Sequence, residues 1–589
     1  MSTTLGTKCS DVYTADGVGN HMVALSALLV RSVKSDIVDI QLTKILDGVH
    51  TNKDLEDLMV LAFQNRMPRG GKGERDVFKT LYSLFFHYED TNLLALDLMD
   101  LIPEYGYWKD LFQLYPQFRG YPQGERIKEI VKSQFYKDEV AVKDWTEGMK
   151  HRVQNIEIPR PTVSLLAKWL PREGHALATE MAGLLVPGSM LYATRMKHYR
   201  HKISPVNTYI NTVEVKMCAK NWSAIDPSVV PGRASKKYAK AFLNQSLQNQ
   251  HALRYPDDTD RMDCRQHFIE YNEKTKTGEV TAKGADTIFP HEIIKKAVSL
   301  GANCEACNAY DDCNCKAYLP ERNQLLGVWK AMVDAAKAGG GLGRSLAMCD
   351  FSGSMACSGK NKDLPYWVSM AMGLLISEVT TDEFKNMFLT FDSTPIMHKL
   401  PSGDLFDRIF SFVGCNIMIG QGLSTDFQKA MDLVLQRCKE KRIKPGQEPE
   451  HLIVLTDMAF DKACGSSEES QYTGNSYRHV VKTEPWQTHV EMIRESFKRA
   501  GEDMWGEGQG LKMPTLVIWN IAATCQDFHA MADTEGVVML SGWSPSLFKV
   551  LQTKGIVKMT PEAALRAQLD DPLYDKIRQR CQAFFARNT

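Results

Sequence analysis

The chain of 589 residues lacks any apolar run long enough to cross a membrane, and it lacks an excess of either charge. A membrane-spanning helix needs roughly 18 or more consecutive apolar residues. The segment from Met1 to Lys8 also lacks the apolar core of a signal peptide. The sequence therefore predicts a cytoplasmic protein with no membrane partner. Lys and Arg together number 71, as do Asp and Glu, so the net charge gives no indication of the partner.

The sequence also lacks the common signatures of enzymes. It contains no G-x-x-x-x-G-K-[ST] phosphate loop, no H-E-x-x-H zinc motif, no G-x-S-x-G nucleophile turn and no dinucleotide fingerprint. We find no paired acidic cluster that would hold a second metal ion for phosphoryl chemistry. We therefore expect a protein that is not an enzyme.

The fourteen cysteines are scattered apart from one cluster, which favours reduced thiols inside a cell. The cluster is Cys304-x-x-Cys307-x5-Cys313-x-Cys315. Four thiols at this separation fit a closed tetrahedral zinc site that stabilises a loop with little core of its own. The spacing is tighter than in most zinc modules, so free thiols and a redox-labile pair are the alternatives. Zn²⁺ is thus a candidate metal for this cluster.

The most informative motif is Asp350-x-Ser352-x-Ser354, which follows an apolar segment at residues 345–349 that we expect to be a β-strand. A carboxylate followed at alternate positions by two hydroxyls presents oxygen ligands at the carboxyl end of a strand, where α/β sheets bind ligands. Mg²⁺ prefers oxygen ligands and keeps some of its water. The motif therefore predicts a site for Mg²⁺ or another divalent cation.

Two further segments complete the expected metal site. Thr425 lies at the start of an amphipathic helix expected over residues 427–438. Asp457 follows a second apolar strand, expected at residues 451–456. We expect the hydroxyls to bind the metal directly, and the carboxylates to bind it directly or through water. The alternative is a Ser/Gly turn, an N-cap threonine and a strand-end aspartate with no metal. The expected ligands are Asp350, Ser352, Ser354, Thr425 and Asp457.

Strands and helices alternate from about residue 341 onwards. Apolar strands are expected at residues 345–349, 385–391, 452–456, 515–520 and 537–540, with helices between them at 366–379, 405–412, 487–500 and 545–551. This alternation predicts a doubly wound, mostly parallel sheet with helices on both faces. Residues 461–485 are polar and irregular, and we expect them to form a loop.

Residues from about 22 to 337 have a mostly helical pattern. Apolar residues recur at helical spacing in residues 54–63, 76–86, 93–101, 163–170, 176–185 and 290–300. No strict repeat is visible, so an irregular helical solenoid is expected. The glycine-rich run from Ala338 to Gly343 is the clearest linker. The predicted domains are a helical module over residues 1–340 with a Cys-rich insertion at 301–318, an α/β domain over 341–560, and a helical tail over 561–589.

Positive charge is concentrated in residues 151–250, which hold 14 Lys and Arg against 5 Asp and Glu. Cationic side chains bind phosphates and aromatic rings stack on bases, and single-stranded nucleic acid binding requires both. The alternative is a solvated helical face with buried aromatic rings. The aromatic residues among these charges are Trp169, Tyr192, Tyr199, Trp222 and Tyr238.

A second basic segment is the glycine-rich loop from Arg66 to Arg75. Its backbone amides and the helix that follows fit a phosphate, although an ordinary inter-helix loop fits equally well. Together the two segments predict an RNA-facing set of cations. Its members are Arg66, Arg69, Lys72, Arg75, Lys168, Arg172, Arg195, Lys197, Arg200, Lys202, Arg233, Lys236, Lys237 and Lys240.

Several passages together resemble the Ro autoantigen class, in which a TROVE-type (telomerase, Ro and vault) helical-repeat module precedes a von Willebrand A domain. The resemblance spans roughly residues 50–555 and is closest to a group of uncharacterised relatives with the same architecture. The matching passages are residues 63–66, 69–75, 103–110, 168–172, 221–226, 230–231, 350–355, 425–427, 456–458 and 541–543. The cysteine cluster and residues 461–485 are not part of the matching pattern.

The resemblance implies a multidomain fold: an α-helical, HEAT-like repeat module, ring-shaped in Ro-like proteins, followed by a doubly wound von Willebrand A domain. In that family the ring takes single-stranded RNA ends on its positive inner surface and structured RNA on its outer face. The aspartate–serine motif would then be a metal-ion-dependent adhesion site. We therefore expect a non-catalytic RNA-binding protein. The alternative is a scaffold that binds no RNA and whose metal accepts a carboxylate from a protein partner.

Overall fold

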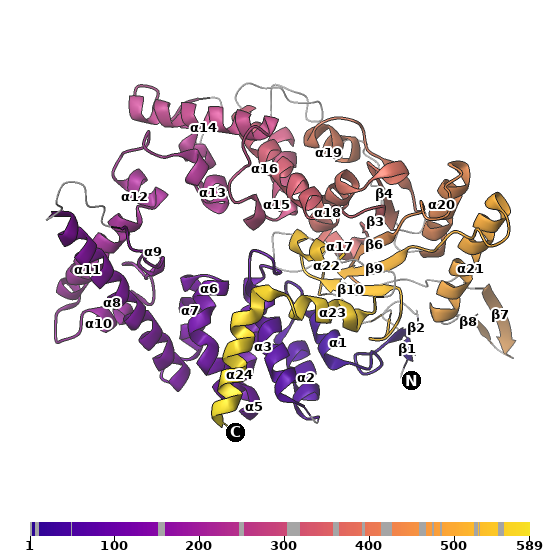
Figure 1. The fold of residues 1–589 in the computed structure, drawn as a ribbon, viewed down its shortest axis with the longest axis horizontal. Helices are drawn as coiled ribbons and strands as arrows, with labels where there is room; N and C mark the ends of the chain where they lie inside the picture. Colours follow the sequence, from indigo (N-terminus) through magenta and orange to yellow (C-terminus); the bar gives the residue numbers. More distant parts are fainter. Residues whose placement is uncertain are drawn as a thin grey trace. The chain divides into compact units, whose positions relative to one another are not determined.

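The computed structural model describes residues 3–5, 11–48, 50–150, 159–246, 252–302, 319–356, 365–391, 395–413, 427–458, 467–473, 476–482, 486–523, 528, 530–551 and 559–588 (Figure 1). The chain forms two compact units that do not follow the order of the sequence. Unit 1 consists of residues 1–77 and 271–575, and unit 2 of residues 78–270 and 576–589. Position 340, where we placed a domain boundary, lies within unit 1. In the part of the chain that is described, no helix is long and apolar enough to cross a membrane.

The centre of unit 1 is a six-stranded sheet in the order β10-β9-β6-β3-β4-β5. All neighbouring strands are parallel except β5, which runs antiparallel to β4. The expected strands are confirmed, and the short edge strand β5 is an addition to them. The strands are β3 (Ser345–Asp350), β4 (Met387–Phe391), β5 (Met397–Lys399), β6 (His451–Thr456), β9 (Thr515–Asn520) and β10 (Val537–Ser541).

The direction in which strands are added reverses between β3 and β6. From β3 the chain continues outwards to β4 and β5, and it then returns to the other side for β6, β9 and β10. In doubly wound sheets, ligands bind outside the carboxyl ends of the strands at this point of reversal. The carboxyl ends of β3 and β6 are the ends that carry Asp350 and Asp457.

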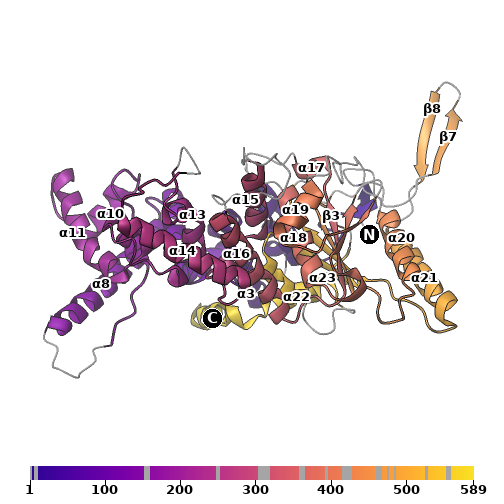
Figure 2. The same ribbon diagram turned by 90° about the horizontal axis from the view of Figure 1, so that it is seen from above.

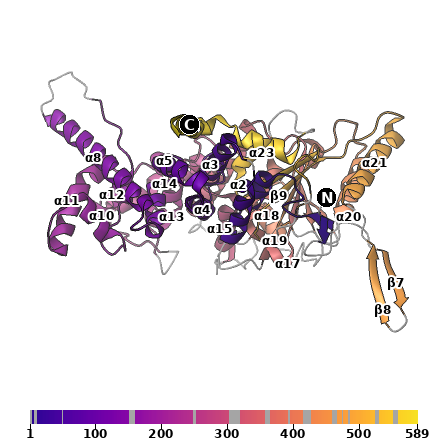
Figure 3. The ribbon, with the colours of Figure 1, turned by 90° about the horizontal axis from the view of Figure 1, so that it is seen from below.

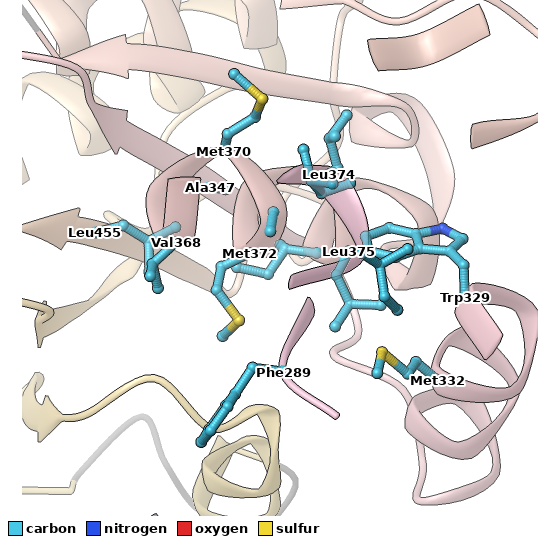
Figure 4. Packing of buried hydrophobic residues seen from close by; sticks show 14 of the residues in the cluster. Phe289, Trp329, Met332, Ala347, Val368, Met370, Met372, Leu374, Leu375 and Leu455 are labelled. Atoms are coloured by element: carbon cyan, nitrogen blue, oxygen red, sulfur yellow. The ribbon is translucent and has the colours of Figure 1, made fainter. Parts of the chain in front are cut away.

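Both faces of the sheet are covered, which explains why the strands read as continuous apolar runs. Alternate residues point to opposite sides, so Ala347 and Leu455 contribute to one buried cluster and Met348 and Val454 to the other. Figure 4 shows the first cluster, in which Met372 and Leu375 lie near Ala347 and Trp329. Its helices are α15 (Pro290–Ala302), α16 (Leu319–Ala338), α18 (Pro365–Val379) and α19 (Leu405–Val413). The opposite face packs against α20 (Phe427–Glu440) and α21 (Trp486–Trp505).

The N-terminal helices belong to the same unit as the sheet. Helix α1 (His21–Leu28) contacts β10 and α23 (Pro561–Leu569), α3 (Asn52–Arg66) also contacts α23, and α2 (Ser35–Leu46) packs against α1. At the carboxyl ends of the strands, Asn520 Nδ2 donates to the Ala27 carbonyl at 3.0 Å. Arg566 forms a two-bond ion pair with the buried carboxylate of Asp57, with its Nη2 at 2.7 Å. Unit 1 is therefore built from segments at both ends of the chain.

Two expectations about local structure were wrong. Residues 461–485 are not entirely loop, because β7 (Ser467–Thr473) and β8 (Ser476–Lys482) pair in antiparallel fashion (Figure 2). Tyr, Val and Thr favour extended structure, and their contribution outweighs the polar composition of the segment. The helix expected at 163–170 is reduced to α9 (Leu166–Trp169). The Asp138 carboxylate accepts the Ser164 N–H at 3.0 Å and holds that residue outside the helix.

The described elements of unit 2 are helices. Within the unit α8, α10 and α11 contact one another (Figure 3). The C-terminal helix α24 (Asp575–Asn588) belongs to this unit from Lys576 onwards, and its Ile577 and Cys581 are buried. Arg580 of this helix forms an ion pair with Asp97 at 3.2 Å. The other helices are the part of α4 (Arg75–Leu84) from Phe78, α5 (Glu89–Leu98), α6 (Ile102–Tyr105), α7 (Trp108–Leu114), α8 (Pro122–Lys150), α9, α10 (Ala178–Leu185), α11 (Tyr192–Ile210), α12 (Val213–Cys218), α13 (Gly232–Phe242) and α14 (Thr259–Thr277) up to Glu270.

Candidate functional site

The metal motif lies where β3 ends. The Asp350 side chain is fully buried, and its Oδ1 accepts the Ser352 backbone N–H at 2.8 Å. Aspartate commonly opens a turn through such a bond two residues ahead, and here the chain continues into the short helix α17 (Gly353–Ala356). The turn places the hydroxyl oxygens of Ser352 and Ser354 3.0 Å apart. Three of the five predicted ligands are thus brought together by one turn.

The fourth predicted ligand, Asp457, follows the neighbouring strand β6. The residue before it, Thr456, is buried and connects the two strand ends. Its hydroxyl donates to Asp350 Oδ2 at 3.0 Å and accepts the Met458 N–H at 3.2 Å. Thr456 was not among the predicted site residues, although its position directly before a strand-end aspartate is a signal that could have identified it.

Two buried carboxylates make this end of the sheet electrostatically unfavourable without a cation. Asp350 and Asp457 are each no more than 1% exposed. Burial, together with the negative charge of Asp457, raises the pKa of Asp350 to about 7. The main influences on this pKa are burial, Asp457 and the hydrogen bonds from Ser352 and Thr456, and none of these groups is cationic. A divalent cation would supply the missing positive charge.

The donor set fits a hard cation. Two carboxylates and two hydroxyls present only oxygen, which Mg²⁺ and similar divalent ions prefer. The described residues contain no cluster of three or more His, Cys, Asp or Glu that could hold a metal ion. Thr425, the fifth predicted ligand, lies outside the described residues. The candidate zinc ligands Cys304, Cys307, Cys313 and Cys315 also lie outside them.

We expect Thr456→Val to weaken metal binding without removing a ligand. Valine has nearly the same shape but cannot donate to Asp350 Oδ2, so the carboxylate loses the group that orients it. Partners of metal ligands typically contribute 10- to 100-fold to affinity, and we expect a loss of about tenfold in Mg²⁺ affinity by calorimetric titration. Thr456→Ser should restore binding, because it keeps the hydroxyl. Equal losses in both variants would contradict the positioning role.

Two of the four predicted RNA-binding cations in the basic loop before α4 are buried and cannot face RNA. The side chains of Arg66 and Lys72 are each only 1% exposed. Lys72 Nζ donates to the Ser26 and Leu29 carbonyls at 3.2 and 3.3 Å and to Ser541 Oγ at 2.6 Å. A Cβ at Gly71 would lie 2.2 Å from a backbone carbonyl oxygen of α3, so the tight turn needs glycine. The glycine-rich sequence therefore serves packing, which corrects the expectation for Arg66 and Lys72.

The other two cations of this loop are accessible. The Arg69 side chain is 64% exposed and forms an ion pair with Asp286 at 2.7 Å. Arg75 is half-buried at the start of α4. Neither lies in unit 2, which holds the remaining predicted cations.

We expect Lys72→Met to destabilise unit 1 and to leave RNA binding unchanged. Burial lowers the pKa of Lys72 to about 7. Between pH 7 and about 10.5 the unfolded chain therefore binds a proton that the folded chain does not, and wild-type stability rises with pH. Methionine keeps the stem but leaves the acceptors of the ammonium unsatisfied, which typically costs about 1–3 kcal/mol. The destabilisation by Lys72→Met should thus grow from pH 7 to pH 9 in denaturant titrations. A constant or shrinking difference would contradict the buried amine.

Helix α13 carries the most concentrated set of predicted cations. It contains no acidic residue, and none occurs between Asp226 and Asp257. Arg233, Lys236 and Lys237 are exposed and Lys240 is half-buried. Positions separated by three, four and seven residues share one face of a helix, so these four side chains lie on one side of α13. Like charges at this spacing repel and destabilise a helix, and an anionic ligand would relieve the repulsion.

Most predicted cations between residues 168 and 202 have a partner on the protein. Lys168 contacts Glu214 at 3.2 Å, Lys202 contacts Glu139 at 2.9 Å, and Arg200 pairs with Glu173 on the surface. Two arginines donate to backbone carbonyls, Arg172 to that of Ala167 and Arg195 to that of Gly188. Lys197 is exposed. Of the predicted cations of α11, Lys197 and Arg200 are the exposed ones.

The aromatic residues among these charges divide into exposed and structural rings. Tyr192 is 55% exposed, whereas Tyr199 is buried and donates its hydroxyl to the Pro171 carbonyl at 3.0 Å. The Arg261 guanidinium carbon lies 3.6 Å from the centre of the Trp222 ring, and Trp222 packs against a small buried cluster. Tyr192 alone of the five predicted rings is largely exposed, and the stacking role expected of Tyr199 is therefore corrected.

Comparisons with known proteins give similarity without an activity. Residues 127–342 match a domain of unknown function, DUF2828, and residues 344–583 match a second, DUF7788. The chain is similar to an uncharacterised protein of Acanthamoeba polyphaga mimivirus, with 24% identity over 515 residues, 86% of this chain and 78% of the viral protein. No solved structure is similar to the chain. The two matched regions meet at residues 342–344, directly before β3.

Proposed function

We propose that the protein binds RNA through the basic helices of unit 2, without catalysing a reaction. The observation that carries the proposal is the four-cation face of α13 in a stretch of chain without acidic residues. Such a face attracts a polyanion, and the lysine and arginine side chains can follow a phosphate backbone. The cations of α11, with the exposed ring of Tyr192, extend the same chemistry to a second helix.

We further propose that the helical part is of the TROVE, HEAT-like type found in Ro-like proteins and that the sheet is of the von Willebrand A type. The sheet order, with aspartates at the point of reversal, supports the second assignment. Asp350, Ser352, Ser354 and Asp457 would hold Mg²⁺ or another divalent cation, which supplies positive charge between two buried carboxylates. Thr425 is the proposed fifth ligand.

Binding of labelled single-stranded and hairpin RNA to the full-length protein, over a salt series with and without EDTA, tests the function. The affinity should fall steeply with salt, because phosphate contacts release counterions. EDTA should have no effect, since the α13 face does not depend on the metal. Absence of binding to both RNAs, or affinity that does not change with salt, would contradict the proposal.

A second candidate function is a protein-interaction scaffold that uses the metal site alone. A metal held partly by neutral hydroxyls keeps positive charge with which to accept a carboxylate from a partner. Retention of the protein on immobilised Glu- and Asp-rich peptides should then require Mg²⁺ and be lost in Asp350→Ala. Retention that ignores both chelation and that substitution would exclude the scaffold.

A further inference from the structure

An exposed apolar segment stands at the start of α11. Three consecutive large side chains, Met190, Leu191 and Tyr192, are 39%, 81% and 55% exposed. All residues from 187 to 194 are exposed, so the described part of the chain leaves these side chains largely uncovered. We call Met190, Leu191 and Tyr192 the apolar tip. Single exposed apolar residues are common, but three large ones in sequence indicate a binding role.

The turn before the apolar tip has a defined conformation. Gly188 has a φ of +108°, which only glycine adopts readily. Its carbonyl accepts a hydrogen bond from Arg195 Nη2 at 2.5 Å, and this bond closes the turn onto the first turn of α11. Leu191 is the N-terminal flanking residue of the helix and is extended, with φ −62° and ψ 146°. The tip is thus presented by a bonded turn at the end of a rigid helix.

The sequence that follows the tip is cationic. No acidic residue occurs between Glu180 and Glu214, a stretch that contains the tip and all of α11. Lys197 and Arg200 are exposed within the first three turns of the helix, and Arg200 has one surface partner, Glu173. An apolar projection with flanking positive charge is the combination that peripheral proteins use at anionic bilayers.

We propose that the apolar tip inserts into the headgroup boundary of a bilayer that contains anionic lipids, with Lys197 and Arg200 near the lipid phosphates. This inference concerns a contact with the surface of a membrane, and it revises the expectation that the protein has no membrane partner. Tyr192, Lys197 and Arg200 also belong to the proposed RNA surface, whereas Met190 and Leu191 do not. Leucine and methionine have no ring to stack on a base, so RNA does not account for the two aliphatic side chains. A stable protein partner would need roughly 800 Å² on this side, which three projecting side chains do not provide. A bilayer deforms around a small projection and needs no matching surface.

Sedimentation of the full-length protein with vesicles of phosphatidylcholine, alone or with 30% phosphatidylserine, tests the proposal. The wild-type protein should bind the mixed vesicles, and 0.5 M salt should weaken this binding. Leu191→Asp places a charge at the most exposed position and should reduce vesicle binding at least tenfold. Val229→Asp is the matched control, because Val229 is 63% exposed elsewhere in unit 2. It should bind vesicles as the wild type does.

Three results would overturn the proposal. The wild-type protein does not bind mixed vesicles, or Leu191→Asp binds them as well as the wild type does, or both variants lose binding equally. RNA binding by the same variants separates the two ligands. If Leu191→Asp reduces RNA affinity and leaves vesicle binding unchanged, the tip belongs to RNA and the bilayer is excluded. Loss of vesicle binding with unchanged RNA affinity is the result we expect.

Discussion

Asp350→Asn should abolish the stabilisation of the protein by Mg²⁺. Ligand binding to the folded state stabilises it by about 2.7 kcal/mol at a concentration 100 times the Kd, and we expect this gain in the wild type. Asparagine keeps the size of the side chain and the oxygen that accepts the Ser352 N–H. It removes the charge that the cation needs. Thermal unfolding with Mg²⁺ and with EDTA measures the difference.

The same variant should lose no stability when the metal is absent. In EDTA, Asp350→Asn should be at least as stable as the wild type, because the substitution removes one of two neighbouring buried negative charges. Asp334→Asn is the control, since this exposed aspartate on α16 pairs with Lys330 at 2.9 Å; it should keep the full Mg²⁺ effect. A variant that is destabilised in EDTA and still responds to Mg²⁺ would contradict the metal site.

Lys236→Glu combined with Lys237→Glu should reduce RNA affinity more than tenfold at low salt. Both residues lie on the exposed face of α13, and the change replaces two attractive charges with two repulsive ones. The slope of log affinity against log salt is about −0.7 per phosphate contact for single strands. Since the double variant loses two contacts, its slope should be shallower than that of the wild type by about 1.4. Fluorescence anisotropy over a salt series measures this slope.

The control for this experiment makes the same change of charge on α8. Lys132 and Lys143 are exposed there, among acidic residues such as Glu129 and Asp144. Lys132→Glu with Lys143→Glu should leave both the affinity and the slope nearly unchanged. Equal losses in the two double variants would show a general effect of net charge and would remove α13 from the interface. Circular dichroism should show that both variants keep their helical content.

The sheet and part of the metal site follow from local sequence patterns. Runs such as residues 515–520 are apolar on both faces, and they are predictable because a strand buried on both sides needs no polar alternation. Asp350, Ser352 and Ser354 are close in sequence, so one turn brings them together. The proximity of Asp350 to Asp457 followed from the rule that parallel strands end at one edge. These features depend on short-range information.

The buried cations depend on long-range information. Lys72 reads as a surface residue of a glycine-rich loop, and only its hydrogen bonds to Ser26, Leu29 and Ser541 show that it is internal. The last of these partners is 469 positions away in the sequence. The packing of residues 1–77 with the sheet was likewise not predictable from periodicity, because an amphipathic pattern does not identify the surface that a helix covers.

Ultraviolet cross-linking of the full-length protein to single-stranded RNA, followed by mass spectrometry of the linked peptides, tests the central claim most directly. We expect cross-links to be concentrated in peptides from α13 and α11, at low salt and equally in EDTA. They should decrease in Lys236→Glu with Lys237→Glu. Cross-links confined to peptides around residues 350–355 and 456–458, or none in unit 2, would contradict RNA binding by the basic helices.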